Sequence, residues 1–202
     1  PRIIEAPQQH ITEAGLVVQD ILTQADYEEM KRHTQCWRDT LLLMFLRNTG
    51  FRPHEVVGVH VANMDRLGPA YIVWVKRAKK RVLSGYEAVY LNPTLGQALH
   101  AYAVGEATPA DQPIFHILER QIQNIVGGAG QRALSRRVQP KEFRRFYIRT
   151  VAEIAVSIVG FGPRHMEVAQ RMVGHESVRT TWDWYFELTQ EQRRRIQEQI
   201  PV

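Results

Sequence analysis

The chain is poor in cysteine and has no long hydrophobic run, and both absences narrow its class. Its 202 residues include one cysteine, Cys36, which excludes an internal disulfide scaffold. The segment that follows, Thr40 to Leu46, is typical of a core helix, so we expect a buried thiol in a reducing, cytoplasmic compartment. The longest apolar run, Leu41 to Leu46, is far shorter than the roughly 20 residues that span a bilayer, which predicts no membrane association.

Motifs for several common chemistries are also missing. Eight histidines are present, but none has a His-x-x-x-His or other typical ligand spacing, which argues against a zinc site. The sequence has no P-loop, no Gly-x-Ser-x-Gly elbow and no pair of catalytic carboxylates. We therefore expect neither a bound metal nor a cofactor.

Composition and apolar periodicity predict one globular domain of the α+β class, mainly helical with a small antiparallel sheet. Hydrophobic residues make up 44% and charged residues 23%, as in ordinary globular proteins. Thr23 and Asp26 form an N-capping pattern that predicts the start of a first helix, and a second helix is expected from about Gln35 to Gly50. β-Branched and aromatic residues predict a hairpin of strands 71–76 and 87–91. Further helices are expected at about 53–59, 93–102, 114–125, 141–159, 166–173, 178–186 and 191–200, with breaks at 127–128 and 160–163 and an exposed loop or extended helix pair at 158–165.

The net charge is +5, and the basic residues gather in two segments. The hairpin carries Lys76, Arg77, Lys79, Lys80 and Arg81. The second segment holds Arg132, Arg136, Arg137, Lys141, Arg144, Arg145 and Arg149. Both adjoin apolar patterns. A solvated charged face is the first interpretation of either run taken alone, and an anionic partner is the alternative.

Three short motifs stand out, and the second and third each have an ordinary alternative, because basic helix faces are common and a tyrosine among Trp and Phe usually fills a core. One reads Thr-Gly-Phe-Arg-Pro-His-Glu and places Arg52 between two helices, where backbone N–H groups also suit a phosphate oxygen. A structural ion pair with the glutamate three residues later is the alternative there. Lys141 and Arg144 lie three residues apart and so share one helix face. His175 follows Val-Gly, and Tyr185 comes ten residues later within Trp-Asp-Trp-Tyr-Phe.

In this order the residues resemble the active-site signature of the tyrosine recombinase (phage integrase) family. The resemblance covers about residues 22–188. The matching positions are Arg52 with its accompanying Glu55, Lys76, Lys141, Arg144, His175 and Tyr185. Lys141 stands where the family usually has histidine, and is similar to the Lys-x-x-Arg pattern of type IB topoisomerases and some telomere resolvases.

The resemblance implies a tyrosine recombinase/type IB topoisomerase-like catalytic core that cleaves and rejoins DNA. Tyr185 would attack the scissile phosphate to give a covalent 3′-phosphotyrosyl intermediate, without metal or ATP. The two arginines and His175 would stabilise charge on the non-bridging oxygens, and Lys141 would assist phosphate binding or activate the tyrosine.

The hairpin lysine would act as general acid toward the 5′-oxygen leaving group. Lys76 is the first choice, and Lys79 and Lys80 compete with it. Contacts to the flanking DNA backbone are expected from Arg77, Lys79, Lys80, Arg136 and Arg137.

The implied partner is double-stranded DNA, and the leading function is site-specific recombination. A telomere resolvase or type IB topoisomerase is the first alternative. A catalytically inactive DNA-binding module is the second, because Tyr185 follows His175 by a longer interval than the family usually has. The family implies a synaptic tetramer, with a monomer or weak oligomer when free, and a bacterial, phage or plasmid origin. Residues 1–20 are interpreted as a linker or the tail of a missing N-terminal core-binding domain, and 21–202 as the catalytic domain.

Overall fold

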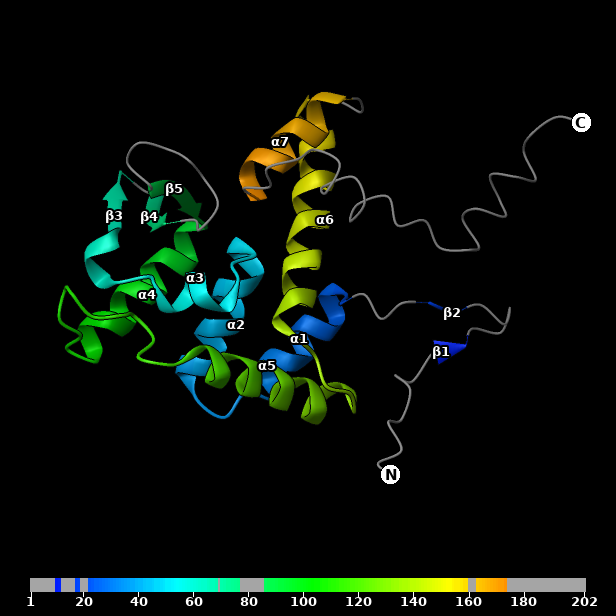
Figure 1. Cartoon of the computed structure of the whole chain (residues 1–202), viewed down its shortest axis with the longest axis horizontal. Coiled ribbons are helices and arrows are strands. Elements are labelled where there is room, and N and C mark those ends of the chain that lie inside the picture. Colours follow the sequence, from blue (N-terminus) through cyan, green and yellow to red (C-terminus); the bar gives the residue numbers. More distant parts are fainter. Residues whose placement is uncertain are drawn as a thin grey trace, which may run out of the picture.

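The computed structural model describes residues 10–11, 17–18, 22–68, 70–76, 86–159 and 163–173. Within these ranges the chain is α+β and mostly helical, as predicted (Figure 1). The helices are α1 (Gln24–Arg32), α2 (Trp37–Thr49), α3 (Pro53–Val57), α4 (Pro93–Gly105), α5 (Glu119–Leu134), α6 (Pro140–Val159) and α7 (Pro163–Val173), with a 3₁₀ turn at Val61–Asn63. The strands are β1 (His10–Ile11), β2 (Val17–Val18), β3 (Met64–Leu67), β4 (Ala70–Lys76) and β5 (Tyr86–Leu91).

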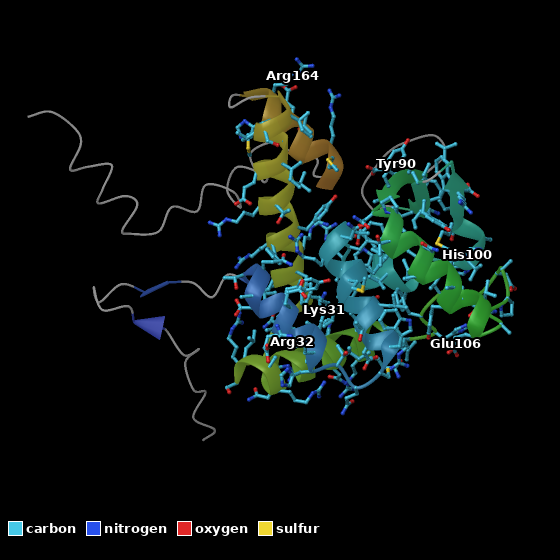
Figure 2. The ribbon with its side chains drawn as sticks, turned by 180° about the vertical axis from the view of Figure 1, so that it is seen from behind. Lys31, Arg32, Tyr90, His100, Glu106 and Arg164 are labelled. Carbon is cyan, nitrogen blue, oxygen red and sulfur yellow. The ribbon has the colours of Figure 1, made fainter. Side chains whose placement is uncertain are left out.

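The larger sheet is antiparallel in the order β3-β4-β5, and α4 covers one of its faces. The predicted hairpin is confirmed, with Trp74 opposite Ala88 and Lys76 opposite Tyr86. Tyr71 is buried against α4, where the absence of a side chain at Gly96 leaves room for its ring. The other face carries the buried Ile72 beside the exposed Trp74 and Tyr90. Figure 2 shows Tyr90 on this part of the molecule, with 64% of its surface exposed.

Helix α2 forms the centre of the core. Leu41, Leu42, Leu43, Phe45 and Leu46 are each fully buried, and α4, α5 and α6 pack against this helix. The remaining side of α2 carries Thr40, Met44, Arg47 and Asn48, which are partly exposed, so the helix has a wide apolar face and one polar side. The helix ends at Gly50, as predicted.

Helix α5 does not break at its glycine pair, so the predicted break at Gly127-Gly128 and the predicted helix at 114–125 are wrong. The helix begins five residues later than predicted, at Glu119, and runs through both glycines to Leu134. Its glycines receive the connection to α6, because a Cβ atom at Gly130 would lie 2.5 Å from Cγ2 of Val138. Close packing therefore explains these glycines better than chain reversal does.

The expectation of a buried thiol at Cys36 is also wrong. Cys36 is exposed and precedes the first residue of α2, one turn before the buried part of that helix begins. Its backbone is extended, as a residue flanking a helix N-terminus requires. The apolar run that follows therefore does not carry the thiol into the core.

Residues 158–159 belong to α6 and residues 163–165 to α7, and these helices pack together as in the second of the two arrangements expected here, while residues 160–162 lie outside the described residues. His165 is fully buried, so this part of the stretch is not an exposed loop. The expected helices at 178–186 and 191–200 lie outside the described residues. Of the helices that are described, none is long and apolar enough to cross a membrane.

Candidate active site

The turn between α2 and α3 presents Arg52 at the start of α3. Gly50 closes α2 in the left-handed conformation, at φ 61° and ψ 22°, and its N–H donates to the carbonyl of Leu46 at 2.9 Å. Thr49 Oγ1 donates to the carbonyl of Phe45 at 2.8 Å. A glycine with positive φ is the usual way to end a helix sharply, and here it turns the chain so that Arg52 directly precedes Pro53 of α3.

Glu55 holds Arg52 in this position. Its buried carboxylate accepts the backbone N–H of Arg52 at 2.7 Å through Oε2, and Oε1 lies 3.5 Å from Arg52 Nη1. The ion pair considered as an alternative from the sequence is therefore present. The Arg52 side chain nevertheless remains 44% exposed, so the guanidinium still reaches solvent and retains donors for an anion.

Arg144 connects α6 to the same turn. Its Nη1 donates to the carbonyl oxygen of Gly50 at 2.7 Å, and the residue is only 5% exposed. This bond joins residues 94 positions apart in the sequence. The two predicted phosphate-binding arginines therefore converge on one turn, since Arg144 is anchored two residues before Arg52.

Gly50 lies directly beneath the ring of Tyr147, which follows Arg144 by one helical turn. A Cβ atom at Gly50 would collide with Cδ1 of that ring. Gly50 thus allows α6 to approach the turn closely, in addition to supplying its positive φ. Tyr147 is itself buried, and its position three residues after Arg144 is the sequence signal that places both side chains on one face.

We expect Gly50→Ala to destabilise the protein by about 2–5 kcal/mol, from left-handed strain and overpacking together. Gly68→Ala is the matched control. Gly68 has nearly the same φ, 60°, but open space where its Cβ would lie, so about 1–2 kcal/mol of strain alone is expected. Urea unfolding monitored by circular dichroism measures the difference, and equal losses for the two variants would contradict the contact with Tyr147.

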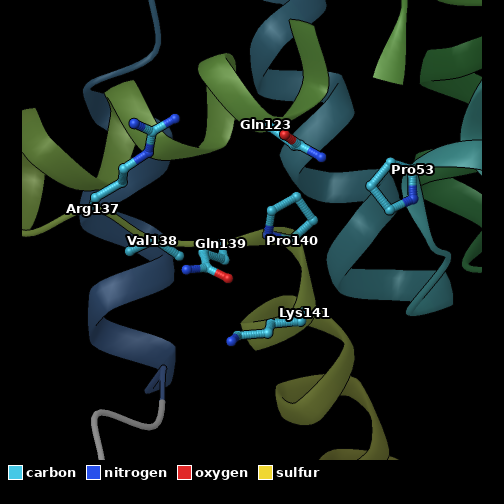
Figure 3. A pocket seen from close by; sticks show the side chains of 7 residues that line it. All are labelled: Pro53, Gln123, Arg137, Val138, Gln139, Pro140 and Lys141. Atoms are coloured by element: carbon cyan, nitrogen blue, oxygen red, sulfur yellow. The ribbon is translucent and has the colours of Figure 1, made fainter. Parts of the chain in front are cut away.

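Lys141 lies at the mouth of a cavity beside this turn. The cavity has a volume of about 570 Å³ and is lined by Pro53, Gln123, Arg137, Val138, Gln139, Pro140 and Lys141. Lys141 is exposed, and Figure 3 shows its ammonium pointing away from Pro53. The structure thus brings the first turn of α6 next to Arg52, with Lys141 as a surface cation at the rim.

The connection between α5 and α6 carries the two other predicted DNA contacts of this region. Arg137 is exposed, and its stem lies along α5 at Gly127, where a Cβ atom would come within 2.9 Å of its Nε (Figure 3). Arg136 is partly buried and its Nη1 donates to Glu142 Oε2 at 2.8 Å. The sequence did not single out Glu142, although a glutamate in the first turn of a helix is a recognisable capping signal.

Arg47 is a second residue that the sequence did not single out, and it links α2 to α6. Its guanidinium carbon lies 3.8 Å from the centre of the Phe146 ring, and Nη2 donates to Thr150 Oγ1 at 2.9 Å. Burial lowers the pKa of Arg47. Burial also raises the pKa of Tyr27, which lines a cavity together with Arg47, to about 12, so this tyrosine is protonated at neutral pH.

Lys76 is the last residue of β4 and is exposed. Alternation along the strand buries Val75 on the face of the sheet that α4 covers and leaves Trp74 and Lys76 exposed on the opposite face. Five other predicted site residues belong to the segments after β4 and near the C-terminus. Arg77, Lys79, Lys80, His175 and Tyr185 lie outside the described residues. Among the side chains that are described, no group of His, Cys, Asp and Glu is arranged to hold a metal ion.

The sequence matches the model of the phage integrase family over residues 16–192. No curated protein matches it significantly. Among solved structures, XerA recombinase is similar with a TM-score of 0.65 and 17% identity, covering 92% of this chain and 67% of that one. The post-cleavage complex of XerH site-specific recombinase with a palindromic difH substrate has a TM-score of 0.62 and 15% identity, covering 88% of this chain and 51% of that one.

A lambda integrase (75–356) dimer bound to a COC′ core site gives a TM-score of 0.58 at 12% identity, covering 82% of this chain and 58% of that one. The chain thus spans about half to two thirds of the length of these structures. Identities this low show a shared fold alone. The family model covers most of the sequence, and on that ground the chain belongs to the phage integrase family, the tyrosine recombinases.

Proposed function

We propose that this chain is the DNA-cleaving and rejoining part of a site-specific recombinase. The observation that carries the proposal is the bond from Arg144 to the carbonyl of Gly50, because it brings two arginines from distant parts of the sequence to one turn. Two guanidinium groups there can each donate to non-bridging oxygens of one phosphate. Such donors stabilise the additional charge of a pentavalent transition state by several kcal/mol.

In the proposed reaction, the Tyr185 oxygen attacks the scissile phosphorus and releases its phenolic proton to water, and the bond from phosphorus to the 5′-oxygen breaks. One phosphodiester replaces another, so the reaction needs no ATP and is reversible by attack of a 5′-hydroxyl. Lys76 gives the proton that the departing 5′-oxygen takes up. His175 adds a donor to the phosphate, and Lys141 assists phosphate binding or activates the tyrosine.

Double-stranded DNA is the proposed partner, with four copies of the chain in a synaptic complex. Three considerations support DNA: the family, the basic rim formed by Arg137 and Lys141, and the DNA that accompanies the XerH and lambda integrase structures. Most of the affinity is then expected to come from contacts to phosphates, which makes binding sensitive to salt.

The test is whether the chain forms a covalent complex with DNA. Duplexes of randomised sequence, nicked so that the cleaved end fragment dissociates, are incubated with the full chain and denatured. We expect a protein–DNA band that survives denaturation and disappears on protease treatment, with one sequence enriched in it. This enriched DNA is called the trapped duplex below. DNA binding without any adduct across the pool would instead support the non-enzymatic DNA-binding module.

Telomere resolution or topoisomerase activity is the second candidate, favoured by lysine rather than histidine at position 141. All three activities share the phosphotyrosyl step and differ in how the ends are rejoined. Sites of the trapped duplex in a supercoiled plasmid separate them. Recombinant junctions support recombination, hairpin ends support resolution, and relaxation alone supports a topoisomerase.

Arg137→Met is expected to weaken binding to random-sequence duplex DNA and to lower its salt dependence. Loss of one phosphate contact reduces the slope of log affinity against log salt by about 0.9. Arg32→Met is the matched control, because Arg32 is an exposed cation of α1 that pairs with Glu29. Fluorescence anisotropy over a salt series measures both slopes. An unchanged slope for Arg137→Met would remove this residue from the interface.

A further inference from the structure

The connection between α5 and α6, residues 135–139, is held by backbone conformation and by packing against α5. It leads directly into the first turn of α6, which carries Lys141. Ser135 ends α5 in the left-handed conformation, at φ 55°. Val138 is buried against Gly130, and the stem of Arg137 lies on Gly127. The connection is therefore held against α5 at Arg137 and Val138.

Glu142 joins this connection to α6 through both of its carboxylate oxygens. Oε1 accepts the backbone N–H of Gln139 at 2.8 Å, and Oε2 accepts Nη1 of Arg136 at 2.8 Å. In return, the N–H of Glu142 donates to the carbonyl of Gln139 at 2.9 Å. The residue is 9% exposed, and its charge lies in the first turn of α6, where the helix dipole favours an anion.

We infer that Glu142, held by Arg136, is a positioning residue for the proposed strand cleavage. It lies between Lys141 and Arg144 on the first turn of α6. Arg144 is anchored at Gly50, whereas Lys141 is exposed and one residue before Glu142. In this structure the Lys141 ammonium points away from Pro53 (Figure 3). The Glu142 carboxylate fixes the backbone from which the lysine side chain turns toward a phosphate bound at Arg52. This inference rests on the proposed function.

The inference gives Arg136 a different role from the phosphate contact that its charge alone predicts. Arg136 is partly buried, and one of its nitrogen atoms is committed to Glu142. If Arg136 contacted DNA, substituting it would lower the affinity for DNA whether or not Glu142 were present. If Arg136 positions Glu142, substituting it lowers the rate of cleavage instead, and the effect requires both Glu142 and Lys141.

The experiment is a double-mutant cycle with Arg136→Met and Glu142→Gln on the trapped duplex. Glu142→Gln keeps an oxygen for the Gln139 N–H but turns an amide donor toward Arg136. Each single variant is expected to lower the single-turnover rate of adduct formation at saturating DNA about tenfold or more, since a misplacement of about 1 Å can cost on the order of 100-fold. The double variant should be no slower than either single variant.

Two further measurements separate positioning from contact and from folding. In a Lys141→Ala background, Arg136→Met should cause no additional loss of rate. For Arg136→Met alone, the dissociation constant for DNA and the slope of log affinity against log salt should stay at the wild-type values, as for Arg32→Met. Arg136→Lys keeps a cation within reach of Glu142 and should recover most of the rate of adduct formation. If circular dichroism shows that Arg136→Met does not fold, Arg136→Lys is used in its place.

Additive rate losses, a loss that persists in the Lys141→Ala background, or a reduced salt slope for Arg136→Met would overturn the inference. In each case the wild-type chain still forms the adduct, so the proposed function stands. A wild-type chain that forms no adduct overturns the proposed function, and the inference with it.

Discussion

A Tyr185→Phe variant should bind random-sequence duplex DNA with the wild-type affinity and form no covalent adduct. The substitution removes only the phenolic oxygen, which the proposed reaction uses as its nucleophile. The aromatic ring stays, so packing changes little. Because no other group can form the phosphotyrosyl bond in the proposed reaction, the expected effect is complete loss of adduct, the largest effect predicted for this chain. Denaturing gels with the trapped duplex measure the adduct, and anisotropy measures binding.

Tyr147→Phe is the sharpest control for this experiment. Tyr147 packs on Gly50 beside the anchored Arg144, which makes it the described tyrosine next to the proposed phosphate site. Its phenylalanine variant keeps the ring contact with Gly50, and adduct formation should therefore continue. The reverse result, an adduct from Tyr185→Phe and none from Tyr147→Phe, would assign the nucleophile to Tyr147.

Helix boundaries set by local chemistry could be predicted from the sequence. Thr23 and Asp26 exchange the reciprocal bonds of a capping box, and Gly50 ends α2 with a positive φ. Both features depend on residues within four positions of each other, so a sequence pattern is sufficient. Strands β4 and β5 were equally clear, whereas β3 was not, because its four residues, Met-Asp-Arg-Leu, are too short and too polar to show a strand period.

Helix α5 shows where local patterns fail. A Gly-Gly pair lowers helix propensity, so considered alone it predicts a break in the helix. In the structure, Gly127 and Gly130 are one turn apart on the surface that receives Arg137 and Val138. The gain from close packing there depends on residues of a later connection, which a window over α5 does not include.

The order of the candidate site residues could be predicted from the sequence, but the hydrogen bonds that hold them in place could not. Arg144 is fixed by a backbone carbonyl 94 residues away, and a carbonyl acceptor has no signature in the sequence. The burial of Glu142 between Gln139 and Arg136 is equally a property of the folded connection. A charge count treats Arg136 and Arg137 alike, whereas the structure pairs one with a carboxylate and leaves the other exposed.

Lys76→Ala is expected to slow cleavage of an ordinary phosphodiester by about 10²–10⁴-fold, the usual contribution of a general acid. Lys76 ends β4 as an exposed residue on the face of the sheet opposite α4, in register with Tyr86. Without its proton, the 5′-oxygen must leave as an alkoxide, which is a poor leaving group. Single-turnover adduct formation on the trapped duplex measures the loss, and DNA affinity should change far less than the rate.

A 5′-bridging phosphorothioate in the trapped duplex decides which lysine acts. Sulfur leaves as a thiolate, whose conjugate acid has a pKa near 8.5, so departure needs no general acid. The sulfur substrate should therefore restore the rate of Lys76→Ala to nearly that of the wild-type chain on the same substrate. Lys79→Ala and Lys80→Ala serve as matched controls from the same hairpin, and each should react at similar relative rates with oxygen and sulfur. Rescue of one of these variants, with none for Lys76→Ala, would move the proton donor from the end of β4 into the segment that follows it.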